Sequence, residues 1–388
     1  MPDRYPEGVL GLDQRYEQDL ATSATEPLRL GGRPLPVVGA ARLYVCGITP
    51  YDVTHLGHAA TFVWADVLAS VLRSTGVDVH VCRNVTDVDD VLLDAAVQRQ
   101  RRVADLSLSQ EFLFEQEMAA LRVRPPTAAP RARGHIGAAI RLGEALLVND
   151  AAYVRDGHVL FRGGGVPARS GLDRERALRL ATENGDHPDD GTRDDPFDVP
   201  VWRPSQPEEP AWPSPWGWGR PGWHGGCAAM ALTVHGPCVD VLVGGDDLAF
   251  PHHAYQAAMV EAATGAAPFA RARVGVGTVR TGGAKMAKST GNLVLVADLL
   301  REHRPAAVRL LLLDRHWAQP WDFEPADLTA AEQRLDELYS ALGRPGGDGA
   351  VGVRARLRDE LDVPGAVQLA LESGGDAARV LVEILGLD

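Results

Sequence analysis

The sequence predicts an α/β fold: a Rossmann-like, doubly wound parallel sheet that carries an inserted subdomain and a C-terminal helical bundle. Three observations support this prediction. Residues 42–85 have the pattern strand, helix, strand; two further strand-like runs, at 239–245 and 272–279, return to the sheet; and the pattern beyond residue 300 is helical. A chain of 388 residues is long enough for two or more domains with buried cores.

The first three elements are defined by their apolar residues. The strand RLYVCGI (42–48) ends at a Thr-Pro turn, and Phe62, Val67 and Val71 are among the apolar residues that recur at helical spacing before Gly76 ends the helix. The second strand is VDVHVCRNV (77–85). Polar residues therefore lie at the ends of both strands, which is where a doubly wound sheet binds its ligands.

Composition divides the rest of the chain. Residues 90–148 are mostly helical in pattern, with a break at RPPTAAP, whereas residues 163–222 are dense in Gly, Pro and Asp, which indicates irregular structure over a site or a surface insertion. We expect an N-terminal arm (1–38), a catalytic domain in two parts (39–122 and 201–280), an inserted subdomain (123–200), a loop and linker (281–305) and a C-terminal helical domain (306–388).

The bulk composition excludes several classes of protein. The sequence starts without the basic and apolar regions of a secretory signal and has no long uncharged apolar stretch, so we expect a cytoplasmic protein that does not span a membrane. A formal net charge of −13 argues against a broad nucleic-acid-binding surface. Four cysteines are too few for a disulfide scaffold, which leaves reduced thiols or metal ligands.

Both lysines of the protein lie in one glycine-rich segment, GGAKMAKSTGN (282–292). Because all the other basic side chains are arginines, Lys285 and Lys288 are either chance survivors of a compositional drift or positions where a planar guanidinium does not serve. A compact ammonium on a flexible stem suits a phosphate that moves during a reaction. We therefore interpret the segment as a mobile phosphate-handling loop.

A second candidate phosphate site is THLGH, at the predicted turn from the first strand into the helix. His55 and His58 are three residues apart on one helical turn, where their N–H groups join free backbone donors in an anion site. The alternative is a core or capping role for both histidines. The downstream lysine segment favours a site for the phosphates of ATP.

Two more groups of residues have side chains that suit chemistry. Cys227 and His252 are a soft thiolate and an imidazole, the usual ligands of zinc, and Cys46 at the end of the first strand is a candidate third ligand. Their spacing matches no zinc finger, so it does not by itself indicate a metal. RNVTDVDD (83–90) offers carboxylates and a threonine for a ribose, an amine or a metal, or simply the start of a solvated helix.

Taken together and in this order, five motifs resemble the cysteine-activating branch of class I aminoacyl-tRNA synthetases. They are VCGITPYDVTHLGHAATF, in which residues 55–58 stand in the place of the HIGH signature, RNVTDVDD, GRPGWHGGC, GGDDLAFPHH and KMAKSTGN, which is similar to the KMSKS loop. The resemblance covers roughly residues 40–345. It implies a class I synthetase type of catalytic domain.

Within this branch the sequence is closer to the cysteine ligases of mycothiol biosynthesis than to the cysteinyl-tRNA synthetases. The wording CGITPYD favours the ligases, as does Gln256, which stands where synthetases generally have a glutamate. The end of the chain is too short for a separate anticodon-binding domain, and residues 331–388 hold 6 arginines against 11 acidic residues. The resemblance therefore implies small-molecule substrates and no nucleic acid.

The resemblance also implies the residues of the site. One catalytic zinc ion is expected on Cys46, Cys227 and His252, with an open fourth position for the sulfur of cysteine. ATP, with Mg²⁺, is expected to be held by the catalytic residues His55, His58, Lys285 and Lys288. The implied adenylate pocket consists of Cys46, Gly47, Ile48, Thr49, Thr61, Asn84, Val85, Thr86, Trp223, Gly245, Asp246, Asp247 and Val279.

The implied reaction has two steps. Cysteine and ATP form cysteinyl-adenylate and pyrophosphate, and the amine of glucosaminyl-inositol, an amino-sugar inositol, then attacks the adenylate to give an amide and AMP. The partners would be these small molecules, and we expect a monomer.

The sequence departs from the family in several places. HGGC stands for HIEC, Ala287 replaces the central serine of KMSKS, and ENGDHP (183–188) stands for the ligase signature ERGGDP. These departures affect the expected acceptor side more than the zinc ligands. A paralogue that joins cysteine to another amine, a cysteinyl-tRNA synthetase and a non-catalytic cysteine or adenylate sensor therefore stay open as alternatives.

Overall fold

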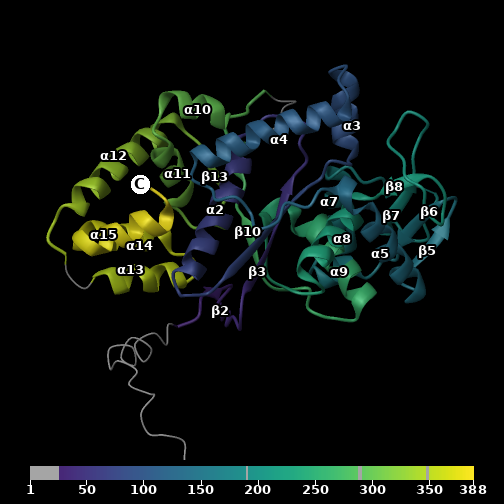
Figure 1. The fold of residues 1–388 in the computed structure, drawn as a ribbon, viewed down its shortest axis with the longest axis horizontal. Helices are drawn as coiled ribbons and strands as arrows, with labels where there is room; N and C mark the ends of the chain where they lie inside the picture. The colour runs from purple at the N-terminus through teal and green to yellow at the C-terminus, as the bar shows by residue number, and fades with distance from the viewer. Residues whose placement is uncertain (1–25, 189–190, 287–290, 347–348) are drawn as a thin grey trace, which may run out of the picture.

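The computed structural model describes residues 26–188, 191–286, 291–346 and 349–388, and its centre is a four-stranded parallel sheet (Figure 1). The strands are β3 (Ala41–Ile48), β4 (Val79–Val85), β9 (Val239–Gly245) and β10 (Ala270–Val276), in the spatial order β10-β9-β3-β4. The chain runs outward from β3 to β4 and from β9 to β10, so the strand order reverses between β3 and β9. The predicted doubly wound sheet is confirmed, with the strands at 42–48, 77–85 and 239–245.

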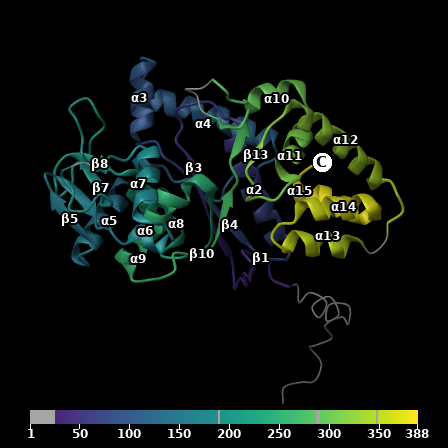
Figure 2. The same ribbon diagram turned by 180° about the vertical axis from the view of Figure 1, so that it is seen from behind.

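Helices cover both faces of this sheet. Successive side chains of a strand point to opposite faces, so each strand contributes to a core on either side. Leu43 and Val45 of β3 pack in one core with α2 (Leu56–Arg73) and the C-terminal helices. Tyr44 packs in the other core with α8 (Trp223–His235) and α9 (Ala254–Thr264). Figures 1 and 2 show the C-terminal helices on one side of the sheet and the inserted subdomain on the other.

The run at 272–279 does not stay in the sheet to its end, which corrects the prediction. β10 ends at Val276, and β11 (Val279–Thr281) belongs to a separate three-stranded sheet with β12 (Ala284–Lys285) and β13 (Trp321–Asp322). Gly277 turns the chain away: its N–H donates to the Trp317 carbonyl at 2.8 Å, and a Cβ there would lie 2.3 Å from the Gln319 oxygen. This turn sets the direction of the lysine segment.

The inserted subdomain has more regular structure than the sequence predicts. A four-stranded antiparallel sheet, in the order β5-β6-β7-β8, is formed by Ala152–Arg155, His158–Phe161, Val199–Pro204 and Gly219–Pro221. α6 (Val166–Arg169) and α7 (Arg174–Glu183) also lie in the stretch interpreted as loop-rich. α7 buries only the small side chains of Ala177 and Ala181, so its apolar face is narrow and most of its residues are charged or polar.

Residues 90–148 are mostly helical, as predicted. They form α3 (Asp90–Gln98), α4 (Val103–Ala120), a 3-10 turn (Ala132–His135) and α5 (Ile136–Val148), with the break at RPPTAAP between α4 and the turn. Two short turns, η2 (Asp246–Leu248) and η3 (Ala249–His253), connect β9 to α9. None of the helices in the described ranges is long and apolar enough to cross a membrane.

The described residues beyond 295 form six helices, as the helical pattern predicts. They are α10 (Val296–Glu302), α11 (Pro305–Leu313), α12 (Pro325–Leu342), α13 (Gly349–Arg358), α14 (Val363–Ser373) and α15 (Gly375–Leu385). Most of the predicted N-terminal arm lies outside the described residues. Its last part forms a hairpin, β1 (Arg29–Leu30) and β2 (Arg33–Pro34), whose Gly31 and Gly32 amides donate to the Glu360 carboxylate.

Candidate active site

A cavity of about 290 Å³ opens at the carboxyl ends of β3, β9 and β10, where the strand order reverses. This is the usual place for a ligand in a doubly wound sheet. Most of the residues predicted for the adenylate pocket and the catalytic group line it. These are Cys46, Gly47, Ile48, Thr49, His55, His58, Thr61, Thr86, Trp223, Gly245, Asp247, Val279 and Lys285.

Three residues predicted for the adenylate pocket do not line the cavity. Asp246 points away and forms an ion pair with Arg273 at 3.1 Å. Asn84 and Val85 are buried in β4 behind the wall. Asn84 shapes that wall: its Oδ1 accepts from the Gly47 N–H at 2.9 Å, and its Nδ2 donates to the Thr86 hydroxyl at 3.1 Å.

The ends of β3 and β4 approach each other so closely at position 47 that only a glycine fits there. A Cβ at Gly47 would lie 1.7 Å from the backbone oxygen of Asn84, which is far inside contact distance. The pairing of the two strands is also irregular between Val45 and Ile48. A glycine here therefore lets the end of β3 pass over β4 and bring Cys46 to the cavity.

The sequence analysis missed one part of the lining. Tyr51 and Asp52 follow β3 and are tied to Arg99, which donates to the Tyr51 carbonyl at 2.7 Å and to the Asp52 carboxylate at 2.8 Å. Gln110 and Phe114 come from α4. Tyr51 and Asp52 end the quoted stretch CGITPYD but were given no role there, and Gln110 and Phe114 belong to no quoted motif, so only the three-dimensional packing reveals them.

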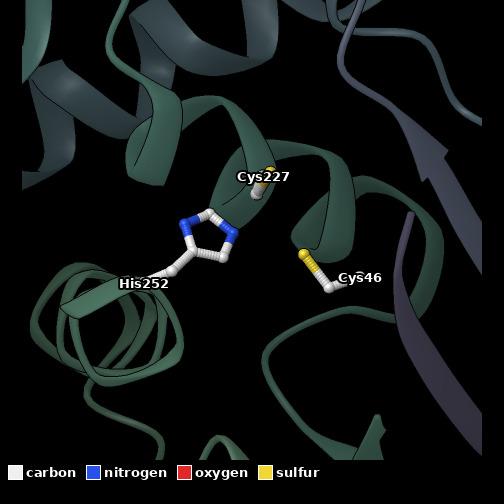
Figure 3. Close-up of side chains that lie close together, drawn as sticks. All are labelled: Cys46, Cys227 and His252. Atoms are coloured by element: carbon white, nitrogen blue, oxygen red, sulfur yellow. The ribbon is translucent and has the colours of Figure 1, made fainter. Parts of the chain in front are cut away.

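Cys46, Cys227 and His252 converge at the edge of the cavity, as the resemblance implied (Figure 3). They come from β3, α8 and η3, and their ligand atoms all lie within 4.8 Å of one another. All three residues are buried. Two thiols and an imidazole are a donor set that suits zinc.

The electrostatics of this cluster favour a thiolate. Donation from the Cys46 thiol and the proximity of His252 hold the pKa of Cys227 well below its ordinary value, whereas the same contact and burial raise the pKa of Cys46. Within the part of the chain that the structure describes, the buried Nε2 atom of His252 has no hydrogen-bond partner. A metal ion between the two sulfurs and this nitrogen would satisfy all three groups.

His224 is a neighbour of the cluster that the sequence analysis did not single out. Its Nδ1 lies 2.8 Å from Nδ1 of His252, so one ring donates to the other and leaves Nε2 of His252 free for a metal. Burial lowers the pKa of His224 well below its ordinary value, which keeps it uncharged. The only sequence signal was its place in GRPGWHGGC, directly after Trp223.

Trp223 and the residues around it complete the metal side of the cavity. The Trp223 ring stacks on His252, with centroids 4.0 Å apart and planes at 15°. Gly225, where the family has an isoleucine, lies against β7, because a Cβ there would come within 3.2 Å of Val201. Gln256, one turn beyond His252, is fully buried beside Tyr44.

His55 and His58 lie together at the start of α2. His55 is the N-cap, its Nδ1 accepts from the Gly57 N–H at 3.1 Å, and its ring stacks on His58 with centroids 3.7 Å apart. Nε2 of His55 therefore carries its proton. Burial and then Lys285 lower the pKa of His55 to about 4, and burial also lowers the pKa of His58, whose ring faces the open cavity. Both are uncharged donors near pH 7.

The lysine segment starts as an ordered hairpin beside these histidines. Gly282 and Gly283, with φ of 60° and 77°, form the turn between β11 and β12, and Lys285 at its end reaches Asp247 at 2.5 Å. Just beyond the segment, Val294 accepts from the Leu56 N–H and Val296 donates to the Thr54 carbonyl. The two predicted phosphate motifs are thus joined. Lys288 lies outside the described residues.

The ENGDHP stretch (183–188) lies in the inserted subdomain and does not line the cavity. Asp186 forms an ion pair with Arg193 at 2.8 Å. The geometry gives this stretch a contact within the subdomain and none with the cavity.

Comparison with known proteins accounts for this combination of fold and site. A family described as tRNA synthetases class I (C) catalytic domain matches residues 36–333, which is more than half of the chain. The chain belongs to this class I synthetase family. The predicted fold class and the resemblance to class I synthetases are both confirmed.

Eight curated relatives of this class I chain share the name L-cysteine:1D-myo-inositol 2-amino-2-deoxy-alpha-D-glucopyranoside ligase. The protein of Acidothermus cellulolyticus is 46% identical over 348 residues, which cover 87% of this chain and 86% of the relative. The protein of Mycolicibacterium gilvum is 44% identical over 347 residues (86% and 78%), and that of Thermobispora bispora 44% over 351 residues (88% and 87%).

Solved structures agree on the class I fold. Methionyl-tRNA synthetase of Mycobacterium tuberculosis, bound by methionyl-adenylate, has a TM-score of 0.61 at 15% identity over 90% of this chain and 88% of its own. A leucyl-tRNA synthetase of Agrobacterium radiobacter K84 in a ternary complex has a TM-score of 0.59 at 10% identity (97% and 86%). At these identities the likeness concerns the fold alone.

Proposed function

We propose that this protein is an ATP-dependent ligase that activates L-cysteine as cysteinyl-adenylate and transfers it to the amine of glucosaminyl-inositol. The observation that carries the proposal is the position of Cys46, which belongs to the metal-ligand cluster and also lines the cavity that holds His55, His58 and Lys285. A thiol-binding centre and an ATP clamp therefore share one chamber. The names of the curated relatives support the same substrates.

Zinc is the metal that we propose for Cys46, Cys227 and His252. When bound, it would supply a Lewis acid of borderline softness, which suits the sulfur of cysteine as a thiolate ligand. The hydroxyl of serine is a harder and far less acidic ligand, so the same centre rejects serine without a separate editing step. Trp223 packs on His252 and closes the side of the cavity next to the cluster.

The chain's own residues serve the first step by positioning and by charge. The carboxylate of cysteine attacks the α-phosphorus of ATP in line, and pyrophosphate leaves. The Nε2–H of His55 and the ring of His58 donate to phosphate oxygens as uncharged groups. Lys285, and in our proposal Lys288, neutralise the charge that grows on pyrophosphate, while Mg²⁺ accompanies ATP.

In the second step the acceptor amine attacks the carbonyl carbon of the adenylate. The C–N bond forms, the C–O bond to AMP breaks, and the amine gives up a proton. The mixed anhydride is activated enough to react without a protein nucleophile. We propose a cytoplasmic monomer for this reaction, with small molecules and no nucleic acid as partners.

Product analysis tests the proposal. The protein is incubated with cysteine, ATP, Mg²⁺ and glucosaminyl-inositol, and the amide, AMP and pyrophosphate are measured together by mass spectrometry. We expect equal amounts of the three products. Formation of AMP and pyrophosphate without the amide would keep cysteine activation and exclude this acceptor, and a screen of other amino sugars would follow. Charging of cysteine tRNA instead of the sugar would favour the synthetase.

A further inference from the structure

The ion pair between Lys285 and Asp247 crosses the cavity in which we place ATP. Nζ of Lys285 and Oδ2 of Asp247 are 2.5 Å apart, and both side chains line the cavity. Asp247 follows the end of β9, and Lys285 lies on β12. A ligand that takes Oδ2 of Asp247 therefore displaces Lys285 from it.

Both partners are held in place by their surroundings. The Asp247 carboxylate lies over Gly245, where a Cβ would come within 2.4 Å of its Oδ1. The hairpin that carries Lys285 is fixed by the Gly283 N–H, which donates to Asp322 at 2.6 Å, and by the Asn292 amide, which donates to the Lys285 carbonyl at 3.2 Å. The pair is thus built into the ends of two separate sheets.

The pair also balances the charge of the side chains that line the cavity. Among the described residues that line the cavity, the charged side chains are Asp52, Asp247 and Lys285, and Asp52 has its own partner in Arg99, at 2.8 Å. His55 and His58 are uncharged near pH 7. A nucleoside that takes the carboxylate leaves the ammonium without a partner, whereas the phosphates of ATP offer it a stronger one.

We propose that the Lys285–Asp247 ion pair selects for polyphosphate nucleotides, because adenosine must break it without compensation and ATP replaces it. This inference rests on the proposed function, in which the nucleoside meets Asp247. The side chains are 63% and 42% exposed, so the pair is worth at most about 1 kcal/mol. That free energy corresponds to roughly a fivefold change in affinity.

Calorimetric titration with adenosine and with ATP tests the proposal on three proteins: the wild type, Lys285→Met and Lys285→Arg. Methionine keeps the length of the side chain and removes its charge, and arginine keeps the charge. We expect Lys285→Met to bind adenosine about two to five times more tightly than the wild type and ATP more weakly. Lys285→Arg should bind adenosine like the wild type. Melting temperatures check that all three are folded.

Salt gives a second test of the same pair. Raising the salt concentration screens an exposed ion pair, so it should tighten adenosine binding to the wild type and leave Lys285→Met unchanged. Equal or weaker adenosine binding by Lys285→Met would overturn the inference. Cysteine-dependent pyrophosphate exchange, measured separately on the wild type, decides the proposed function, so failure of either claim is recognised by itself.

Discussion

His55 and His58 present uncharged imidazoles to the cavity, and the protonation state of His55 can be measured directly. Burial lowers the pKa of His55 to about 4, so the folded protein binds fewer protons than the unfolded chain between this pH and about 6.5. This group therefore stabilises the fold fully above about pH 6.5, and its contribution is lost as the pH falls toward 4. ATP meets a neutral donor throughout the neutral range.

We expect ¹⁵N NMR of histidine-labelled protein to show His55 as the Nε2–H tautomer, because Nδ1 accepts from Gly57. The signal should stay that of a neutral ring down to about pH 4. The His55→Asn variant assigns it. A titration midpoint of the His55 ring near pH 6.5, the pKa of a free imidazole, would contradict this description of the site.

The second prediction for a single residue concerns Gly47. A Cβ would overlap the Asn84 oxygen, so Gly47→Ala must displace the end of β3, and with it Cys46. We expect cysteine-dependent exchange to fall on the order of 100-fold, since a shift of about 1 Å has that effect on a positioned reaction. Gly134→Ala, with nothing within 4 Å of its Cβ, is the matched control and should keep the wild-type rate.

Asp89 caps α3 and gives a third prediction, concerned with stability. Burial raises its pKa to about 6, so the folded state holds a proton that the unfolded chain releases between about pH 4 and 6. The wild type should lose stability over this range as the pH rises. Asp89→Asn keeps an acceptor for the Val91 N–H and does not titrate.

Urea unfolding at pH 4 and pH 7 measures this effect. The difference in free energy of unfolding between Asp89→Asn and the wild type should shift in favour of the variant by on the order of 2 kcal/mol from pH 4 to pH 7. Asp173→Asn, at the exposed N-cap of α7, controls for the loss of a charged cap. A constant difference for Asp89→Asn across the pH range would refute the assignment.

Among the elements, the hairpin of β11 and β12 adds most to its sequence interpretation. Two glycines beside two lysines predicted a loop that closes over phosphates. Gly282 and Gly283 form a tight turn with positive φ, and the pairing of Arg280 with Lys285 gives the first lysine a defined position. The pattern of residues predicted the chemistry, but the conformation depends on β13, some forty residues away.

Gly283→Ala tests this turn. Nothing lies within 4 Å of the added Cβ, so any effect comes from the left-handed backbone, which costs alanine about 1–2 kcal/mol. We expect slower pyrophosphate exchange and a higher KM for ATP. Gly283→Asn should recover most of the loss, because asparagine adopts this conformation more readily. Equal behaviour of the two variants would argue against a role for the turn.

Other elements show where sequence patterns succeed and fail. The strands β3, β4 and β9 are mostly buried and rich in valine and other apolar residues, and their bounds were predicted to within two residues. The sheet of the inserted subdomain was missed, because its strands are short and carry prolines at 200, 204 and 221. The metal ligands came from the resemblance, since residues 46, 227 and 252 meet only through the crossing of three elements.

At the scale of the whole molecule, a buried ion pair joins α2, which packs on the parallel sheet, to the C-terminal helices. Arg309 of α11 donates to Asp66 of α2 at 2.5 Å and to the Leu121 carbonyl at 2.7 Å, and it is fully buried. A further donation reaches the Leu385 carbonyl at the end of α15. This one side chain therefore connects the helix that begins at His55 with both ends of the helical domain.

Removing that side chain should be costly. Arg309→Met leaves the buried Asp66 carboxylate with Arg124 as its remaining ion-pair partner, and we expect a loss of about 3–5 kcal/mol in the free energy of unfolding. Arg304→Met removes an exposed ion pair with Asp336 and should cost less than about 1 kcal/mol. Urea unfolding of both variants checks this, and equal losses would contradict the buried pair's role.

The most direct test of cysteine activation is the exchange of labelled pyrophosphate into ATP by the zinc-loaded protein, with cysteine and serine in parallel. We predict exchange with cysteine, no exchange above background with serine, and loss of the cysteine signal after chelation that zinc restores. Exchange that is absent with cysteine, or equal with serine, would contradict the account of a cysteine-selective centre at Cys46, Cys227 and His252.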